Sequence, residues 1–178
     1  CRMSDIKNYH SEEHSLSNGQ VLMRNYSFEE ALVIVREMTD NLALDLFEKG
    51  LVTSSLTLWI AYDHRYEHEA SKGTVKLERE SNSSKKIIDA VEDLYLRIAD
   101  RYTGIRRIEV CANRVAPESY VQYSLFDDPK QTDKERHLQE AVLNVKQRYG
   151  KNAIMRGSNL LECSTYRERN EQVGGHRA

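Results

Sequence analysis

The chain has 178 residues, of which 39% are hydrophobic and 30% are charged, and its formal net charge is -2. No apolar run reaches the roughly 20 residues of a membrane-spanning helix and no signal-peptide pattern opens the chain, so we expect a cytoplasmic protein with no membrane partner. The charge excludes attraction of nucleic acid by bulk charge, so any such binding depends on locally placed Lys and Arg.

The first part of the chain predicts a linker, a strand and a helix. Residues 1–13 are polar and lack periodicity, which predicts a connection from upstream domains. Weak alternation over residues 14–22 indicates a short or bulged strand. Ser27, three residues before Glu30, forms a capping-box pattern, and the helix it opens ends at Lys49-Gly50. Its apolar positions recur at spacings of three and four: Phe28, Ala31, Leu32, Val35, Met38, Leu42 and Leu46.

Alternating patterns predict three further strands, over residues 52–62, 73–78 and 105–112. A second amphipathic helix follows the serines at 81, 83 and 84, runs to Tyr102 and stops by Gly104. The order strand, helix, strand, strand, helix, strand predicts an α+β fold. We expect a four-stranded antiparallel sheet with two helices on one face and the other face open to a ligand.

Beyond the last strand, the peptide Gln122-Tyr123-Ser124-Leu125-Phe126 places two large apolar side chains where no pattern predicts their burial. Burying a Leu or Phe is worth about 1.5 to 3 kcal/mol, so such a loop either folds back onto its own core or offers both residues to a partner. Thr132 and Glu135 predict a capping box for a helix over 132–150. Residues 151–178 are polar and weakly patterned, which predicts a flexible tail.

The residue pattern predicts no catalytic site. The chain has no Asp-x-Asp pattern of the kind that holds two metal ions. Cys1, Cys111 and Cys163 are scattered and odd in number, which favours reduced thiols over a disulfide framework. His64 and His68 lack companion ligands, which favours solvated loop histidines over a metal site. We therefore expect no enzyme activity, cofactor or metal in this chain.

The element order and the peptide that follows it resemble the little finger domain of Y-family (UmuC/ImpB/MucB/SamB-like) DNA polymerases, the translesion enzymes. Five stretches carry the resemblance: Ser15–Gly19, Arg24–Ser27, Thr53–Tyr62, Ile105–Val110, and the ending Tyr166–Asn170 with Gly174–Ala178. The resemblance implies a little finger over 14–117, a clamp-binding loop over 118–131, a helix over 132–150 and a tail over 151–178.

The resemblance also implies a function and partners. The parent protein would be a bacterial polymerase of translesion synthesis and DNA repair in the SOS response, with Mg²⁺ in a palm domain that precedes this chain. The partners would be primer-template DNA, the sliding clamp, and the palm and thumb domains of the same chain. Gln122-x-Ser124-Leu125-Phe126 resembles the peptide that binds the clamp, in which the amide enters a polar pocket and the Leu and Phe fill a hydrophobic groove.

For DNA, we expect contacts to the backbone that ignore base identity. Three kinds of group would make them: the main chain of Ser15, Ser17, Asn18 and Gly19; the hydroxyls of Ser55, Thr57 and Thr74; and the charges of Lys76 and Arg107, with Trp59 stacking on a base or sugar. Many little fingers carry Lys or Arg on the second strand, where this chain has Trp59 and Ala61. From Ser15 to Ala116 the chain has 14 basic residues against 16 acidic ones, which predicts weak DNA affinity.

Alternatives remain at the level of sequence. A sheet face that contacts only solvent is one of them. An RRM-like RNA-binding module shares the element order, but it needs stacking aromatics on its third strand, and Gly73–Leu77 has none. A metabolite-sensing domain of similar topology is another, and it would be favoured by dimerisation around a ligand.

Overall fold

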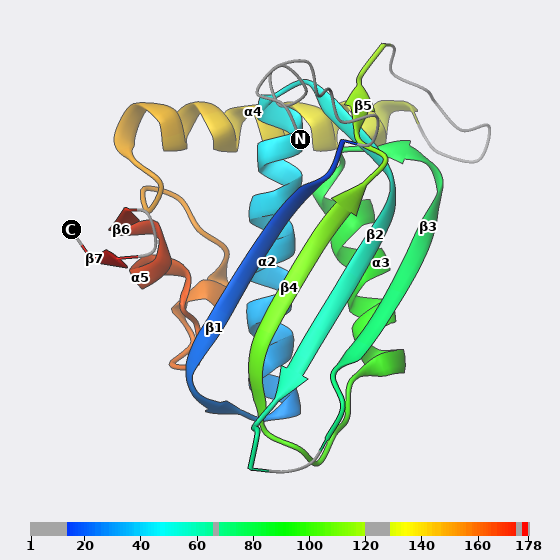
Figure 1. Ribbon diagram of the computed structural model, residues 1–178. Coiled ribbons are helices and arrows are strands. Elements are labelled where there is room, and N and C mark those ends of the chain that lie inside the picture. The colour runs from blue at the N-terminus through cyan, green and yellow to red at the C-terminus, as the bar shows by residue number, and fades with distance from the viewer. Residues whose placement is uncertain (1–13, 66–67, 120–128, 174–175, 178) are drawn as a thin grey trace, which may run out of the picture.

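The computed structural model describes residues 14–65, 68–119, 129–173 and 176–177. Four long strands form one antiparallel sheet in the order β1-β4-β2-β3, with β1 at Leu16–Tyr26, β2 at Leu51–Tyr62, β3 at Ser71–Ser81 and β4 at Ile105–Asn113. Two helices, α2 (Phe28–Glu48) and α3 (Ser84–Ile98), cover one face of this sheet (Figure 1). The predicted α+β fold is confirmed, with β1 and β3 at the edges of the sheet.

The ends of α2 follow local signals in the sequence. The Ser27 hydroxyl accepts a hydrogen bond from the Glu30 backbone at 3.2 Å, and the Glu30 carboxylate accepts one from the Ser27 backbone at 3.0 Å. The helix ends at the C-cap residue Lys49, and Gly50 then adopts a φ of 62°, a left-handed conformation that glycine takes without a steric penalty. The capping box predicted for this helix is confirmed.

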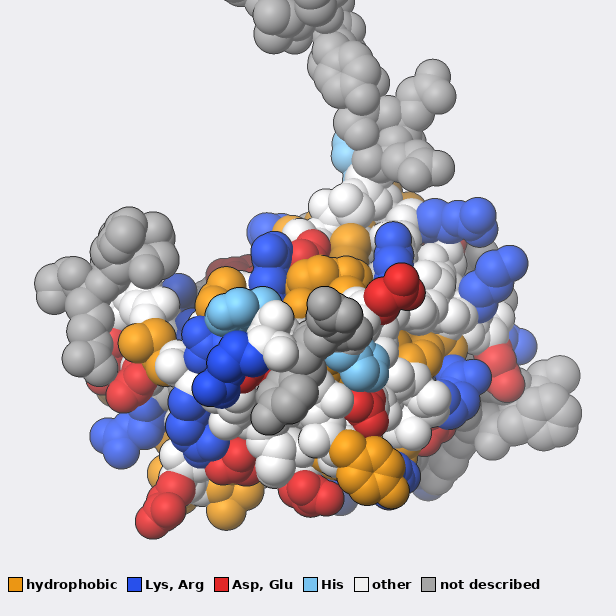
Figure 2. Space-filling view, turned by 60° about the horizontal axis from the view of Figure 1, so that its bottom comes forward, with side chains coloured by type: hydrophobic (Ala, Val, Ile, Leu, Met, Phe, Trp, Pro, Cys, Tyr) orange, Lys and Arg blue, Asp and Glu red, His pale blue; other side chains and the backbone are white. Residues whose placement is uncertain are grey.

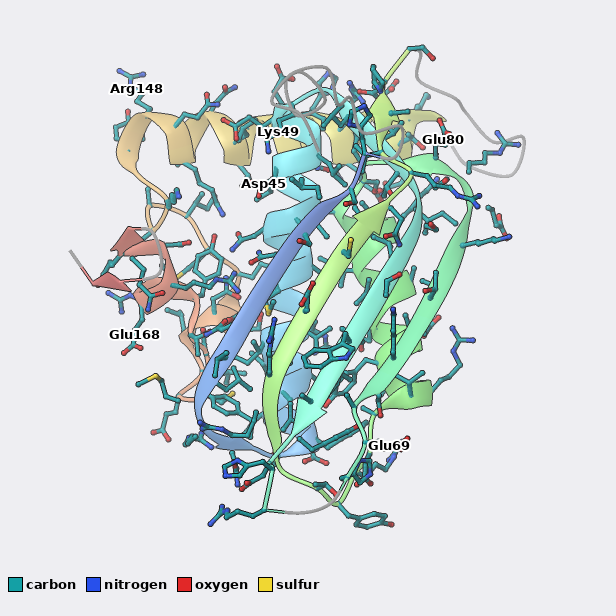
Figure 3. All side chains as sticks on the ribbon, in the orientation of Figure 1. Asp45, Lys49, Glu69, Glu80, Arg148 and Glu168 are labelled. Atoms are coloured by element: carbon teal, nitrogen blue, oxygen red, sulfur yellow. The ribbon has the colours of Figure 1, made fainter. Side chains whose placement is uncertain are left out.

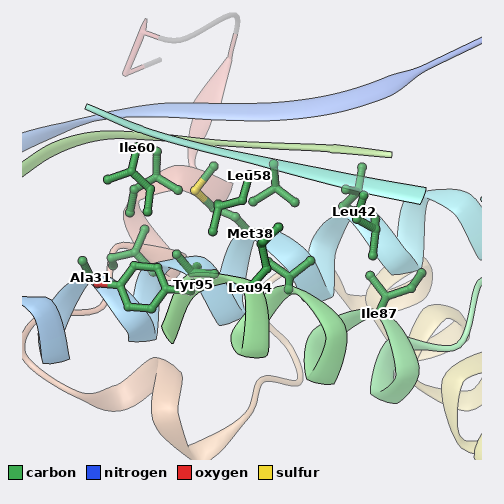
Figure 4. Packing of buried hydrophobic residues seen from close by; sticks show 14 of the residues in the cluster. Ala31, Met38, Leu42, Leu58, Ile60, Ile87, Leu94 and Tyr95 are labelled. Atoms are coloured by element: carbon green, nitrogen blue, oxygen red, sulfur yellow. The ribbon is translucent and has the colours of Figure 1, made fainter. Parts of the chain in front are cut away.

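The hydrophobic core lies between the sheet and the two helices (Figure 4). Alternate residues of β2 enter it, and Leu56, Leu58 and Ile60 are completely buried. Close packing requires a glycine on β3, because a Cβ at Gly73 would lie 2.8 Å from a methyl carbon of Leu94 on α3. Gly73 therefore faces α3, and its neighbours Lys72 and Thr74 face the opposite side of the sheet.

The ends of β1 and α3 differ from the prediction. The strand β1 continues to Tyr26 through an irregularity after Val21, so Arg24 to Tyr26, beyond the predicted end at residue 22, belong to the strand. The helix α3 ends at Ile98, and Tyr102 is 95% exposed and outside it. The cause lies at Asp100, whose carboxylate accepts hydrogen bonds from the Tyr102 backbone and the Thr103 hydroxyl and so forms a turn in place of further helix.

The third helix, α4 (Pro129–Tyr149), begins before the predicted start. Thr132 lies inside it, so the capping box predicted at Thr132 and Glu135 is wrong. Proline suits the first turn of a helix, where the missing backbone N–H has no intrahelical partner. A short strand that the sequence did not predict, β5 (Ala116–Pro117), pairs with Leu51 and Val52 of β2 before α4 begins.

Residues 151–173 pack on the domain, where the sequence predicts a flexible tail. They contain a 3-10 turn, η1 (Gly157–Leu160), a short helix, α5 (Tyr166–Asn170), and β6 (Gln172–Val173), which pairs with β7 (His176–Arg177). Tyr166 is only 1% exposed, and Arg156 forms a two-bond ion pair with Asp40 of α2 at 3.0 and 2.8 Å. Tyr166 and Arg156 are isolated residues that belong to no periodic pattern, so the sequence does not predict that this segment packs on the domain.

Candidate nucleic-acid interface

The face of the sheet opposite α2 and α3 is turned toward the viewer in Figures 1 and 3. Antiparallel pairing places partner residues on the same face, so the register defines rows of neighbouring side chains across the strands. One row runs from β1 to β3 through Ser17, Cys111, Thr57 and Thr74. The next row contains Gly19, Glu109, Trp59 and Lys72 in the same strand order. We call this surface the open face.

The centre of the open face is a neutral polar network. The hydroxyls of Thr57 and Thr74 are 2.9 Å apart, and the Asn113 amide donates to Thr57 at 2.8 Å. Cys111 Sγ lies 3.3 Å from Asn113 Oδ1, and burial raises the pKa of the Cys111 thiol. Hydroxyls and amides of this kind donate to phosphate oxygens without regard to base identity.

Charged side chains surround this network. The guanidinium carbon of Arg107 lies 5.1 Å from the centre of the Trp59 ring, and Arg107 Nη2 lies 3.4 Å from Glu109 Oε2. Lys72 and Lys76 on β3 are exposed, while Glu69 precedes β3 and Glu80 is near its end (Figure 3). Figure 2 shows the same mixture of basic, acidic and apolar side chains on the end of the molecule at the bottom of Figure 1. The face therefore offers a few separate cations.

Most of the residues predicted to contact DNA lie together on the open face. They are Ser17, Thr57, Trp59, Thr74, Lys76 and Arg107, with Gly19 in the same set of rows. Ser15 precedes β1 and hydrogen-bonds the side chain of Cys111. Ser55 belongs to the same face, between Asn113 and Lys76, but it is only 7% exposed.

Asn18 points to the other side of the sheet. Its side chain lines a cavity of about 350 Å³ with Asn41 and Asp45 of α2 and with residues of α4 and α5. Asn18 alternates with Ser17 and Gly19 along β1, so its side chain is on the helix side by the ordinary pleat of a strand. The contact predicted for Asn18 is through its main chain, which lies on the edge strand β1, and it does not depend on the side chain.

Four residues of the open face were not predicted as part of a site: Lys72, Glu109, Cys111 and Asn113. Lys72 precedes the predicted start of β3. It lies two residues before Thr74 and four before Lys76, so the alternation of a strand places all three on the same face, and this spacing is the signal in the sequence. The three residues on β4 share the parity of Arg107. Their neighbours on the face follow only from the register between strands, which is a long-range property.

The residues predicted to bind the clamp, Gln122, Ser124, Leu125 and Phe126, lie outside the described residues. The described residues before and after this peptide contact each other through hydrogen bonds. Arg136 of α4 donates to both carboxylate oxygens of Glu118 at 2.7 and 3.0 Å, and this hydrogen-bonded ion pair lowers the pKa of Glu118. The Gln139 amide also donates to the Asn82 carbonyl at 2.9 Å. Glu118, before residues 120–128, and α4, after them, therefore pack on the same domain.

His64 and His68 both lie in the described part of the chain. The side chain of His64 is 94% exposed, and His68 contacts Asp100 at 3.2 Å. Among the described residues, no group of three or more His, Cys, Asp or Glu side chains is placed to hold a metal ion. Within the same residues, no helix is both long enough and apolar enough to cross a membrane.

The described residues form an α+β domain in which helices cover only one side of the sheet. Residues 13–125 match the model of the impB/mucB/samB family C-terminal domain, and the chain belongs to this family.

Two curated relatives carry the name DNA polymerase IV 2. The protein from Bacillus subtilis (strain 168) is 24% identical over 166 residues, covering 92% of this chain and 39% of the relative. The protein from Halalkalibacterium halodurans is 21% identical over 168 residues, covering 94% of this chain and 40% of the relative. The chain thus spans about two fifths of the length of these relatives.

Among solved structures, a chain in the complex of beta-clamp processivity factor and little finger domain of PolIV aligns with a TM-score of 0.44 and 12% identity. The alignment covers 64% of this chain and 100% of that chain. A chain in the post-insertion binary complex of Dbh DNA polymerase aligns with a TM-score of 0.42 and 15% identity, over 58% of this chain and 29% of that chain.

Proposed function

We propose that this chain is the DNA-binding C-terminal part of a bacterial Y-family DNA polymerase that acts in translesion synthesis and DNA repair. The observation that carries the proposal is the family match over residues 13–125, which spans the whole sheet and both covering helices. The two curated relatives named as DNA polymerases support it. In this proposal, catalysis with Mg²⁺ belongs to a palm domain outside this chain, and the chain holds the substrate.

The open face grips the backbone of the primer-template. Lys72, Lys76 and Arg107 attract phosphates, and the hydroxyls of Thr57 and Thr74 donate to them. Contacts of this kind carry no sequence information, so they tolerate a damaged base in the template. Lys72, Lys76 and Arg107 are the cations that the described register places on the face, and the domain has an acidic excess, so the grip is weak.

The peptide over Gln122, Ser124, Leu125 and Phe126 tethers the enzyme to the sliding clamp. Two apolar anchors and one amide of a short peptide typically reach micromolar affinity, which is about -8 kcal/mol. A clamp already on DNA raises the effective concentration of the finger near the primer end, so a weak DNA binder stays in place. The tether and the open face therefore act together.

The DNA contact is tested by titrating salt in a binding assay with a labelled primer-template. Binding through phosphates loses affinity as salt rises, and each lost contact reduces the slope of log affinity against log salt by about 0.9. We expect Lys72→Ala and Lys76→Ala to weaken binding and to reduce the slope. Lys49→Ala is the matched control, because Lys49 lies at the end of α2 in the helix layer (Figure 3).

Binding that is insensitive to salt, or no binding at low salt, would contradict the proposal. A clear preference for single-stranded RNA over primer-template DNA would instead support the RNA-binding alternative.

A further inference from the structure

A carboxylate occupies the middle of the open face. Glu109 of β4 pairs with Gly19 of β1 on one side and with Trp59 of β2 on the other. Its side chain is 37% exposed. A carboxylate carries the same sign of charge as a phosphate, so its presence at the centre of a DNA-binding face requires an explanation.

The Glu109 side chain lies beside the backbone of β1. The position that a Cβ would take at Gly19 is 3.6 Å from Glu109 Cγ and 3.9 Å from Glu109 Cδ. Gly19 belongs to the segment whose main chain is proposed to contact phosphates. A phosphate that approaches this part of β1 therefore meets the Glu109 carboxylate.

Glu109 also contacts the nearest cation of the open face. Its Oε2 is 3.4 Å from Arg107 Nη2, while the Arg107 guanidinium lies over the Trp59 ring at 5.1 Å. The Arg107 side chain is 50% exposed, so its remaining N–H groups face solvent or an incoming ligand. Arg107 is held between an anion and an aromatic ring on the surface proposed for DNA.

We propose that Glu109 competes with the DNA phosphate for Arg107. It binds Arg107 when no DNA is present, and it thereby limits the affinity of the open face for DNA. This inference rests on the proposed function. A bound phosphate takes over the hydrogen bonds of Arg107 and places a second negative charge beside Glu109, and the two anions repel each other. The competition keeps the grip on DNA weak and easily reversed, so that holding the primer end depends on the clamp.

The variant Glu109→Gln tests the proposal, because Gln keeps the size and the hydrogen-bonding oxygen and removes the charge. Binding of a labelled primer-template should tighten about two- to fivefold, the range of an exposed ion pair. The slope of log affinity against log salt should become steeper, by at most about 0.9 if one phosphate contact is gained. Asp93→Asn is the matched control, because it removes the same charge from the exposed side of α3 and should leave both values unchanged.

A second variant tests whether the effect passes through Arg107. In the background of Arg107→Ala, Glu109→Gln should lose more than half of its gain in affinity. A gain that is undiminished without Arg107 would overturn the competitor role, as would equal affinity and slope in the unchanged chain and in Glu109→Gln.

Failure of the proposed function is distinguishable from these outcomes. It would appear as no DNA binding at low salt by the unchanged chain and by every variant, all of which remain folded in thermal unfolding. That result would contradict both proposals. Salt-sensitive binding with no effect of Glu109→Gln would contradict only the role of Glu109.

Discussion

At the scale of residues, one buried hydroxyl joins the two helices of the core. Tyr95 of α3 is completely buried, and its hydroxyl donates to the backbone carbonyl of Phe28 at 2.8 Å. The two rings also contact each other, with centres 4.9 Å apart. Burial raises the pKa of Tyr95, so its hydroxyl remains a donor throughout the ordinary pH range. This single residue fixes the start of α2 against α3.

We expect Tyr95→Phe to lower the free energy of unfolding by about 0.5 to 1.5 kcal/mol, the net value of a hydrogen bond in a folded protein. Urea unfolding measures the loss. Tyr102→Phe removes the same hydroxyl from a side chain that is 95% exposed, and it should leave the free energy of unfolding unchanged. Equal stability of the two variants would show that the bond to Phe28 contributes nothing.

At the scale of elements, the segment after α4 attaches to α2 through a buried carboxylate. Glu37 of α2 is 2% exposed and accepts hydrogen bonds from the Ser164 hydroxyl and from the Thr165 backbone. Burial raises the pKa of Glu37 above its ordinary value of 4.5, against the lowering effect of the bonds from Ser164 and Thr165 and of the charge of Arg169. Residues 151–173 therefore dock on a group that binds a proton more readily in the folded chain than in the unfolded one.

The raised pKa of Glu37 predicts a dependence of stability on pH. A carboxyl whose folded pKa exceeds its unfolded pKa loses stability as pH rises from 4.5 through the folded pKa, because the folded state must then bury a charge. We expect Glu37→Gln to remove part of the loss of stability that the unchanged chain shows between pH 5 and pH 7, because the glutamine cannot become charged as pH rises.

Urea unfolding of both proteins at the two pH values measures this difference. Glu29→Gln, at an exposed position in the first turn of α2, is the control. If Glu37→Gln and the unchanged chain lose stability in parallel, the buried charge is not the cause.

The sequence predicts those elements whose signals are local. Ser27 and Glu30 mark the start of α2, and the alternation of Leu56, Leu58 and Ile60 identifies the core side of β2. The turn at Asp100 was missed because its hydrogen bonds to Tyr102 and Thr103 compete with an apolar pattern that continues past the end of α3. The docked segment after Gly150 was missed because Tyr166 and Glu37 are single buried residues far apart in the chain.

The candidate site was predictable only in part, because some of its features follow from local patterns and others from contacts between distant residues. Side chains alternate between the two faces along each strand, and this alternation places Thr57, Thr74 and Lys76 on the open face. It also places Lys72 on the open face and the Asn18 side chain on the helix side of the sheet. The contact of Glu109 with Arg107 and its approach to Gly19 depend on the register between β1 and β4. Register joins residues about 90 positions apart in the sequence, so no local pattern contains it.

At the scale of the whole molecule, the described residues on both sides of the peptide predicted to bind the clamp contact each other and the sheet. Glu118 donates its backbone N–H to the Gly50 carbonyl at 2.8 Å and pairs through its carboxylate with Arg136 of α4. Glu118 and α4, on the two sides of residues 120–128, thereby belong to the domain that carries the open face. Because the open face carries few cations and one central anion, we propose that the clamp supplies most of the holding energy at DNA.

The retention of this chain on a primer-template that carries a loaded sliding clamp tests this division most directly. The unchanged chain should remain bound at a salt concentration at which it leaves bare DNA, with an apparent affinity about 100-fold or more above that for bare DNA. Leu125→Ala with Phe126→Ala should abolish that retention while leaving affinity for bare DNA at low salt unchanged. If the double variant is retained as well as the unchanged chain, or the clamp adds nothing, the account is contradicted.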